Sequence, residues 1–195
     1  LTTGEGGAIV TDSKEIYEKI KLIRSHGRMD KINYFNNPEQ SEYIDIGYNW
    51  RMSSITAALG VSQMSKLKKI IKNRQEHARH ISRGLSNIKG IQVPRSEENS
   101  KHIFQMYTIK LESKKDRERL HAHLTKKRIF SKVYFNPVHL TNFYKNKFGT
   151  KVGMLPITEK ISEQVLTLPL YPNMVNEEKD YLISSIKEFF ETNNE

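Results

Sequence analysis

The stretch Leu1-Thr-Thr-Gly-Glu-Gly-Gly-Ala-Ile-Val10 opens the chain with closely spaced glycines followed by a short apolar run. Glycines at this spacing are typical of a tight turn. The apolar run over residues 8–11 is typical of a buried strand. Asp12 then resembles a helix N-cap, with Glu15 at the third helical position. The opening therefore predicts a turn, a buried strand and a helix in succession.

The next residues alternate between helical and irregular patterns. Apolar residues at helical spacing predict a helix over residues 13–25, closed by Gly27 as its C-cap residue. Residues 28–45 are polar and aperiodic, and a loop of this length suggests a function. A helical pattern resumes at Ser53 or Ser54 and continues to about residue 88, with a break or kink expected near Ser62-Gln63.

Beyond a boundary near Gly90 and Pro94, short strands and helices follow one another. The patterns predict strands at 91–93, 103–111, 129–135 and 166–170, helices at 114–127, 158–164 and after Asn176, and irregular chain over 140–156. Strands separated by helices without a regular repeat indicate a small α+β unit from about Asn87 to the C-terminus.

The composition is that of an ordinary globular protein, with 36% hydrophobic and 28% charged residues. No stretch approaches the roughly 18 uninterrupted apolar residues that a membrane helix needs. The chain has no cysteine, which excludes disulfides and thiolate metal sites and fits a reducing compartment. We therefore expect a cytoplasmic protein. The histidines form no pattern with carboxylates that would predict a metal site.

The charge balance raises nucleic-acid binding as a first hypothesis. Lys and Arg number 32 against 22 Asp and Glu, a net charge of +10. The basic clusters, at 66–69, 114–115 and 126–128, lie on predicted helices and are typical of solvated faces. No zinc-finger, RRM-like or helix-turn-helix signature accompanies them, which argues against nucleic acid. A positive field would equally attract phosphate and nucleotide-sugar anions.

Two more motifs follow the opening stretch, namely Gly47-Tyr-Asn-Trp-Arg-Met52 and Tyr134-Phe-Asn-Pro-Val-His-Leu140. Taken together and in this order, the three motifs resemble the DegT/DnrJ/StrS family of pyridoxal-phosphate-dependent sugar aminotransferases. The resemblance implies the α/β fold class, specifically the C-terminal part of a fold-type-I transferase. Residues 1–86 would be the tail of the large cofactor-binding domain with its connecting helices, and residues 87–195 the small α+β domain.

In this family a catalytic lysine that binds pyridoxal 5′-phosphate lies just ahead of a Thr-Thr-Gly-Glu-Gly-Gly stretch. The resemblance therefore places that lysine upstream of Leu1, and Lys14 lies beyond the predicted strand and cannot replace it. The chain, which has neither an initiator Met nor a secretory leader, is expected to be the later part of a longer enzyme. It would contain no catalytic residue and would be inactive alone.

The resemblance implies that Asn49 binds the cofactor. The corresponding residue reaches the cofactor phosphate of the partner subunit, which implies a homodimer with shared active sites. An amide N–H suits this role because it is a neutral donor. Tyr48 and Trp50 would then anchor the contact between subunits. From the residues alone, Asn49 could equally be a turn or N-cap residue before the helix at Ser53.

Four other residues are candidates for substrate binding. Arg51 could bind a phosphate or carboxylate with two hydrogen bonds, or form a salt bridge that anchors its loop. His139 and Tyr134 could each bond a sugar hydroxyl, or be ordinary core or surface residues. His26 could face the entrance of the active site, although a histidine at a helix C-terminus is favourable in any case.

The resemblance implies transfer of an amino group to a nucleotide-linked keto sugar, with glutamate as amino donor, in surface polysaccharide or amino-sugar biosynthesis. Two alternatives stay open. Some relatives carry a histidine in place of the lysine and dehydrate sugars with the same cofactor. The chain could also be a non-catalytic module that binds a partner or nucleic acid through its basic surface.

Overall fold

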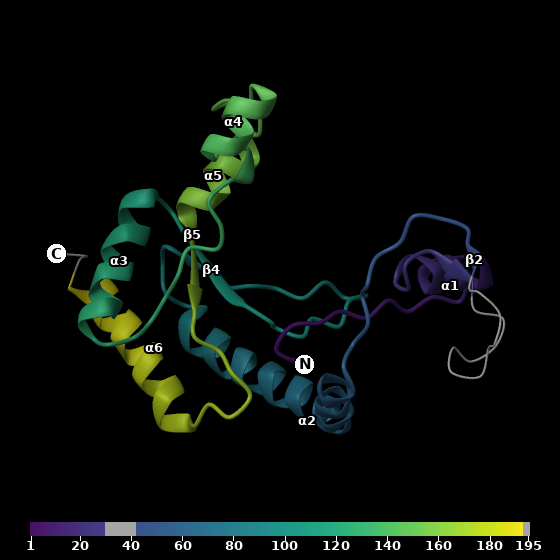
Figure 1. The fold of residues 1–195 in the computed structure, drawn as a ribbon. Helices are drawn as coiled ribbons and strands as arrows, with labels where there is room; N and C mark the ends of the chain where they lie inside the picture. The colour runs from purple at the N-terminus through teal and green to yellow at the C-terminus, as the bar shows by residue number, and fades with distance from the viewer. Residues whose placement is uncertain (30–41, 193–195) are drawn as a thin grey trace. The chain divides into compact units, whose positions relative to one another are not determined.

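A computed structural model describes residues 1–29 and 42–192 of the chain. The chain separates into two compact units, Leu1–Leu67 and Lys68–Glu195 (Figure 1). The division falls inside the longest helix, α2 (Ser54–Leu85).

Helix α2 begins where the sequence predicts, because the Ser53 hydroxyl accepts a hydrogen bond from the Thr56 N–H at 3.2 Å. The helix continues without interruption to Leu85, so the break expected near Ser62-Gln63 is absent. The domain boundary that the resemblance implies, after residue 86, lies just beyond the end of this helix and stays a prediction.

The first unit contains helix α1 (Lys14–Ile23) and a two-stranded ribbon of β1 (Arg28–Met29) and β2 (Glu42–Tyr43), which pair antiparallel. Helix α1 ends earlier than expected, and its C-cap residue is Arg24 and not Gly27. This glycine has φ +71°, and its N–H donates to the Leu22 carbonyl at 2.8 Å. The predicted loop over 28–45 is thus paired at both ends, and its residues 30–41 lie outside the described part of the chain.

Two further predictions for the first unit are wrong. The helix is capped by Ser13, whose side chain accepts from the Ile16 N–H, and not by Asp12, because the helix begins one residue later than expected. Residues 8–11 form no strand, and Val10 is 95% exposed. An apolar run becomes a buried strand only when another strand pairs with it, and no described residue pairs with this one.

The second unit contains a three-stranded antiparallel sheet in the order β3-β4-β5. Its strands are β3 (Ile91–Gln92), β4 (Tyr107–Leu111) and β5 (Val165–Leu168), and its helices are α3 (Lys114–Lys126), α4 (Asn142–Phe148), α5 (Pro156–Gln164) and α6 (Asn176–Glu191). Helices α3 and α6 lie side by side, α3 and α5 contact the sheet, and α4 extends away from it (Figure 1).

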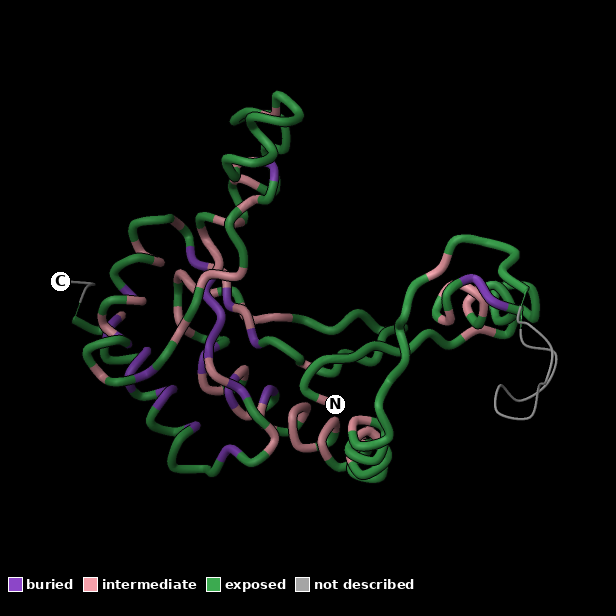
Figure 2. The backbone as a smooth tube through the Cα atoms, viewed as in Figure 1, coloured by how far each residue is buried: buried purple, intermediate pink, exposed green. Residues whose placement is uncertain are grey.

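The core of the second unit is formed by the sheet, by α3 and α6, and by the last turns of α2. Buried residues gather on these elements in Figure 2. Strand β4 alternates as a half-buried strand should, with Tyr107, Ile109 and Leu111 inside. Tyr107 is fully buried, and its hydroxyl bonds the Ser82 hydroxyl at 2.8 Å. Burial raises the pKa of Tyr107 to about 12.

The second unit also corrects two predictions. Residues 129–135 form no strand, because Lys132 alone among them exchanges backbone hydrogen bonds with Thr167 of β5, and a single bridge does not make a ladder. The region 140–156 is not irregular throughout. A 3-10 turn at Val138–Leu140 leads into α4, which ends at Gly149 with φ +66°.

Candidate functional site

The motif Gly47–Met52 forms a bend that is hydrogen-bonded to the end of α1. The Tyr48 N–H donates to the Ile23 carbonyl at 2.6 Å, and the Trp50 N–H donates to the Arg24 carbonyl at 3.0 Å. In return, the Tyr48 carbonyl accepts from the His26 N–H at 2.9 Å. The backbone on both sides of Asn49 is therefore fixed, and Asn49 itself pairs in a bridge with Ser25.

Two glycines allow this close approach of backbone to backbone. A Cβ atom on Gly47 would overlap the backbone nitrogen of Gly27. A Cβ atom on Gly27 would overlap the carbonyl oxygen of Asp45. Both positions thus require glycine, which gives a physical reason for Gly47 in the motif around Asn49.

The Asn49 side chain is exposed on this bend. No hydrogen bond to its amide group is found among the described residues, so its donors are available to a ligand. The helix that follows is capped by Ser53, so the N-cap interpretation of Asn49 is wrong. The flanking rings of Tyr48 and Trp50 stack with their centroids 4.3 Å apart, and both are more than half exposed.

Arg51 and His26 lie on the same bend. The Arg51 guanidinium donates to the Ser25 hydroxyl at 2.8 Å, and no carboxylate in the described part of the chain pairs with it. His26 follows α1, is exposed and has φ +65°. The structure therefore brings Asn49, Arg51 and His26 together within the first unit.

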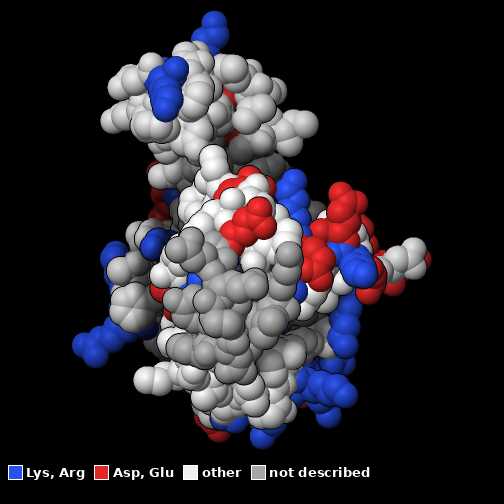
Figure 3. Space-filling model, turned by 45° about the vertical axis from the view of Figure 1, so that its right-hand side comes forward, with Lys and Arg blue, Asp and Glu red and all other residues white. Residues whose placement is uncertain are grey.

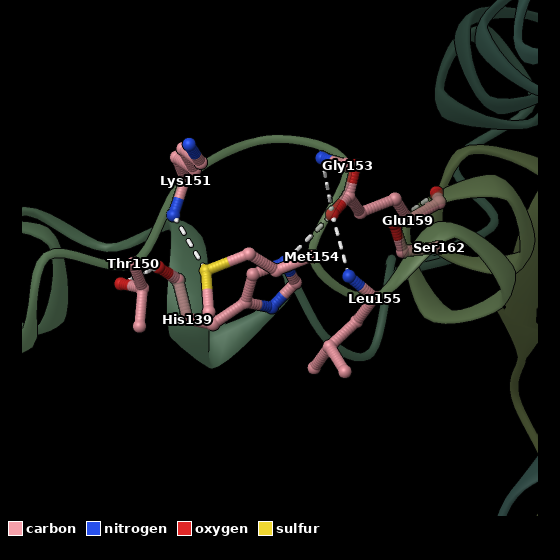
Figure 4. A network of polar contacts seen from close by, with 8 residues as sticks. All are labelled: His139, Thr150, Lys151, Gly153, Met154, Leu155, Glu159 and Ser162. Carbon is pink, nitrogen blue, oxygen red and sulfur yellow. Dashed lines mark hydrogen bonds and ion pairs between the residues drawn. The ribbon is translucent and has the colours of Figure 1, made fainter.

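Tyr134 and His139 belong to the second unit. Tyr134 is half-buried, with the Lys132 ammonium 5.3 Å from its ring centroid. His139 is only 8% exposed, and its Nε2 lies 2.8 Å from a carboxylate oxygen of Glu159 (Figure 4). The Thr150 hydroxyl donates to the His139 carbonyl oxygen. His139 is therefore held from both its side chain and its backbone.

Glu159 is a residue that the sequence did not single out. Its carboxylate also accepts from the Gly153 N–H at 2.9 Å and from the Leu155 N–H at 3.2 Å (Figure 4). The hydrogen bond from His139 and that from Gly153 lower the pKa of Glu159 below its ordinary value. The sequence indicated Glu159 only as a carboxylate in the first turn of a helix that begins with Pro156.

A cavity of about 970 Å³ lies elsewhere in the second unit, between α2 and the residues that connect β3 to β4. It is lined by Arg79, Arg83 and Lys101 together with Glu98 and several hydroxyl groups. It contains none of the predicted site residues.

The charged residues and the helices of the described chain can be compared with what a metal site or a membrane span requires. On the face drawn in Figure 3, Lys and Arg form several separate groups with Asp and Glu between them. Over residues 1–29 and 42–192, no cluster of three or more His, Asp or Glu side chains could hold a metal ion. No helix in the same ranges is both long and apolar enough to cross a membrane.

Residues 1–187 match the model of the DegT/DnrJ/EryC1/StrS aminotransferase family. The chain is 30% identical over 190 residues to GDP-perosamine synthase of Escherichia coli O157:H7, covering 97% of this chain and 49% of that protein. It is 29% identical over 195 residues to the spore coat polysaccharide biosynthesis protein SpsC of Bacillus subtilis, covering 96% of this chain and 50% of that protein. The chain thus spans about half the length of the curated relatives it matches.

Among solved structures, the chain resembles PseC of Helicobacter pylori, an aminotransferase involved in the biosynthesis of pseudoaminic acid. The TM-score is 0.86 at 29% identity, covering 98% of this chain and 50% of that chain. The predicted fold class is confirmed, since the matched half is the C-terminal half of a fold-type-I aminotransferase. The cofactor of the family is pyridoxal 5′-phosphate. The chain belongs to the DegT/DnrJ/EryC1/StrS aminotransferase family.

Proposed function

We propose that this chain is the C-terminal part of a pyridoxal-phosphate-dependent sugar aminotransferase that works as a homodimer with shared active sites. The observation that carries the proposal is the bend at Gly47–Met52. It fixes the backbone around Asn49 by hydrogen bonds and leaves the amide side chain exposed. A relative that the chain matches, GDP-perosamine synthase, and the PseC structure support the activity.

The exposed Asn49 amide fits the phosphate group of the cofactor. It can donate a hydrogen bond to a phosphate oxygen without changing the charge of the site. When bound, pyridoxal phosphate supplies the electron sink that lets an amino group pass from a donor to a ketone. The stacked rings of Tyr48 and Trp50 would pack against the partner subunit, which delivers Asn49 to the partner's cofactor.

The finer assignment of the substrate rests on chemistry and on names of relatives. We propose a nucleotide-linked keto sugar as amino acceptor and glutamate as amino donor. The net charge of +10 would attract such anions. Arg51 and His26 would bind anionic or polar groups near the cofactor, and His139 and Tyr134 would contact the sugar. Surface polysaccharide or amino-sugar biosynthesis in the cytoplasm is the corresponding pathway and compartment.

The catalytic lysine is proposed to precede Leu1, so this chain alone would not turn over. The alternative sugar dehydratase differs at that single position, where a histidine would stand. The codons immediately before Leu1 in the complete reading frame therefore test the proposal directly. A Lys followed by one more residue supports the aminotransferase, and a His at that place contradicts it.

Mixed dimers of the complete gene product test the shared site. One protomer carries a substitution of the catalytic lysine, and the other carries Asn49→Ala. If Asn49 serves the partner's cofactor, one site of each mixed dimer combines an intact lysine with an intact asparagine, and activity returns. Restored transaminase activity is the expected result. No restoration, with both parent variants folded and dimeric, would refute the sharing of sites.

A matched control and the non-catalytic alternative can be tested in parallel. Asn73→Ala changes the same residue type at a site where the amide donates to the Pro172 carbonyl, and it should leave cofactor binding intact. A cofactor absorbance band that appears only with the upstream sequence supports the enzyme. Tight, salt-sensitive binding of nucleic acid without such a band would support the basic binding module instead.

A further inference from the structure

The contact between His139 and Glu159 fixes the location of a proton. An ionised carboxylate only accepts hydrogen bonds, and the pKa of Glu159 is lowered by its donors. The 2.8 Å contact therefore requires the proton on Nε2 of His139. In a neutral imidazole the other nitrogen, Nδ1, then carries a lone pair and is an acceptor.

The Nδ1 atom is available for a ligand. No hydrogen bond to it is found among the described residues, and Figure 4 shows the second ring nitrogen turned away from Glu159. The Thr150 hydroxyl holds the His139 carbonyl, and the hydrogen bond with Glu159 holds the ring itself.

Glu159 also fixes the chain around the ring. Its carboxylate accepts from the N–H groups of Gly153 and Leu155, which belong to the connection between α4 and α5. One carboxylate therefore sets both the tautomer of the histidine and the position of the loop beside it (Figure 4).

We propose that Glu159 is a positioning residue that holds His139 as the Nε2–H tautomer and presents Nδ1 as an acceptor to a hydroxyl group of the sugar substrate. This inference rests on the proposed function, because the sugar is the ligand assigned there. In this tautomer the ring can only accept a hydrogen bond from the substrate, at Nδ1. A substrate that lacks the donating hydroxyl should therefore lose the contact.

Nitrogen-15 NMR of the histidine side chains tests the tautomer without any activity measurement. In the wild-type protein, we expect the neutral His139 ring to be protonated at Nε2 and unprotonated at Nδ1. Glu159→Gln keeps an acceptor oxygen and should retain this state, whereas Glu159→Ala should give a mixture of tautomers. Glu163→Gln is the matched control, since this exposed carboxylate on the same helix pairs with Lys114. His139→Gln identifies the signals.

Steady-state kinetics of the complete enzyme tests the link to the substrate. Glu159→Ala should raise KM for the keto sugar by roughly five- to tenfold with a smaller change in kcat, as expected for the loss of one hydrogen bond. The half-reaction with the amino donor should be unchanged. Glu163→Gln should alter neither.

The outcomes separate the inference from the proposed function. If the tautomer of His139 does not change in Glu159→Ala, the inference is overturned whatever the enzyme does. If the tautomer changes but KM for the sugar does not, the part that concerns substrate contact is overturned. If the complete enzyme transaminates no sugar while the tautomer depends on Glu159, the proposed function fails and the positioning of the ring stands.

Discussion

The two units of the chain differ sharply in the burial of their apolar residues. All 17 buried hydrophobic residues of the described chain belong to the second unit. In the first unit, by contrast, Ile46, Trp50 and Ile55 are each more than 60% exposed. The second unit has a core of its own, and the described residues of the first unit do not.

Because of this difference, the candidate site residues of the two units are held in place by different interactions. His139 in the second unit is held by a carboxylate within a packed domain. Asn49 in the first unit is held by backbone hydrogen bonds and by two glycines that permit close approach. A bend made in this way can present a side chain to another molecule without a core beneath it. The following predictions test this contrast, from the largest expected effect to the smallest.

The largest effect should come from deleting core volume in the second unit. Ile186→Ala, on α6, removes a fully buried side chain and should lower the free energy of unfolding by about 3 kcal/mol. Ile55→Ala makes the same change at a helical residue that is 85% exposed and should stay within about 0.5 kcal/mol. Urea denaturation followed by circular dichroism measures both. Equal effects would remove the distinction between the two units.

A smaller but still clear effect should come from Gly27→Ala. The new Cβ would overlap the Asp45 carbonyl and occupy a strained positive φ, so the bend should open. Hydrogen exchange of the Tyr48 and Trp50 amides should accelerate at least about tenfold, which corresponds to about 1.4 kcal/mol. Gly4→Ala has a similar φ of +83° and open space, and it should leave these amides protected. Acceleration in both variants would show that the effect is not specific to the overlap at Gly27.

A third effect is the pH dependence of the stability that Glu159 contributes to the second unit. The folded-state pKa of Glu159 lies below its unfolded value, so its contribution is fully present above the ordinary Glu pKa of about 4.3 and is lost as pH falls through the folded value. The difference in urea midpoint between wild type and Glu159→Gln should therefore shrink in acid. Glu163→Gln, on the same helix, is the matched control. A constant difference across this range would argue that the carboxylate charge is irrelevant to stability.

The smallest effect on stability should come from the proposed cofactor ligand. Asn49→Ala removes an exposed side chain and should change the free energy of unfolding by less than about 0.5 kcal/mol. Asn73→Ala removes the donor to the Pro172 carbonyl and should cost about 1 kcal/mol. Thermal or urea unfolding compares the two. A larger cost at Asn49 would mean that it supports the fold, which is the turn-residue interpretation.

The sequence predicted the helices best, since caps and amphipathic spacing are local signals. Helices α1 and α3 lie within about two residues of their expected bounds, and α6 begins at Asn176, next to its expected start. The strands expected at 8–11 and 129–135 failed because pairing depends on a distant partner that an apolar run does not reveal. Helix α4 was missed because its aromatic and basic residues follow no clear period, although Gly149 marked its end.

The candidate site was predictable in part. The motif around Asn49 identified the bend. The His26 N–H donates a hydrogen bond to this bend, and the close approach of the Asp45 carbonyl requires a glycine at position 27. Glu159 could not be predicted, because its partner His139 lies 20 residues away and the contact depends on how the loop between α4 and α5 folds back. Local sequence patterns do not predict how this loop folds.

Tyr107 has a consequence at the alkaline end of the pH scale. Because its pKa is about 12 in the folded state and about 10 in the unfolded state, the stability that comes from its burial is complete below pH 10 and is lost as pH rises toward 12. Alkali should therefore weaken the second unit through the ionisation of one buried phenol, whatever ligand is present.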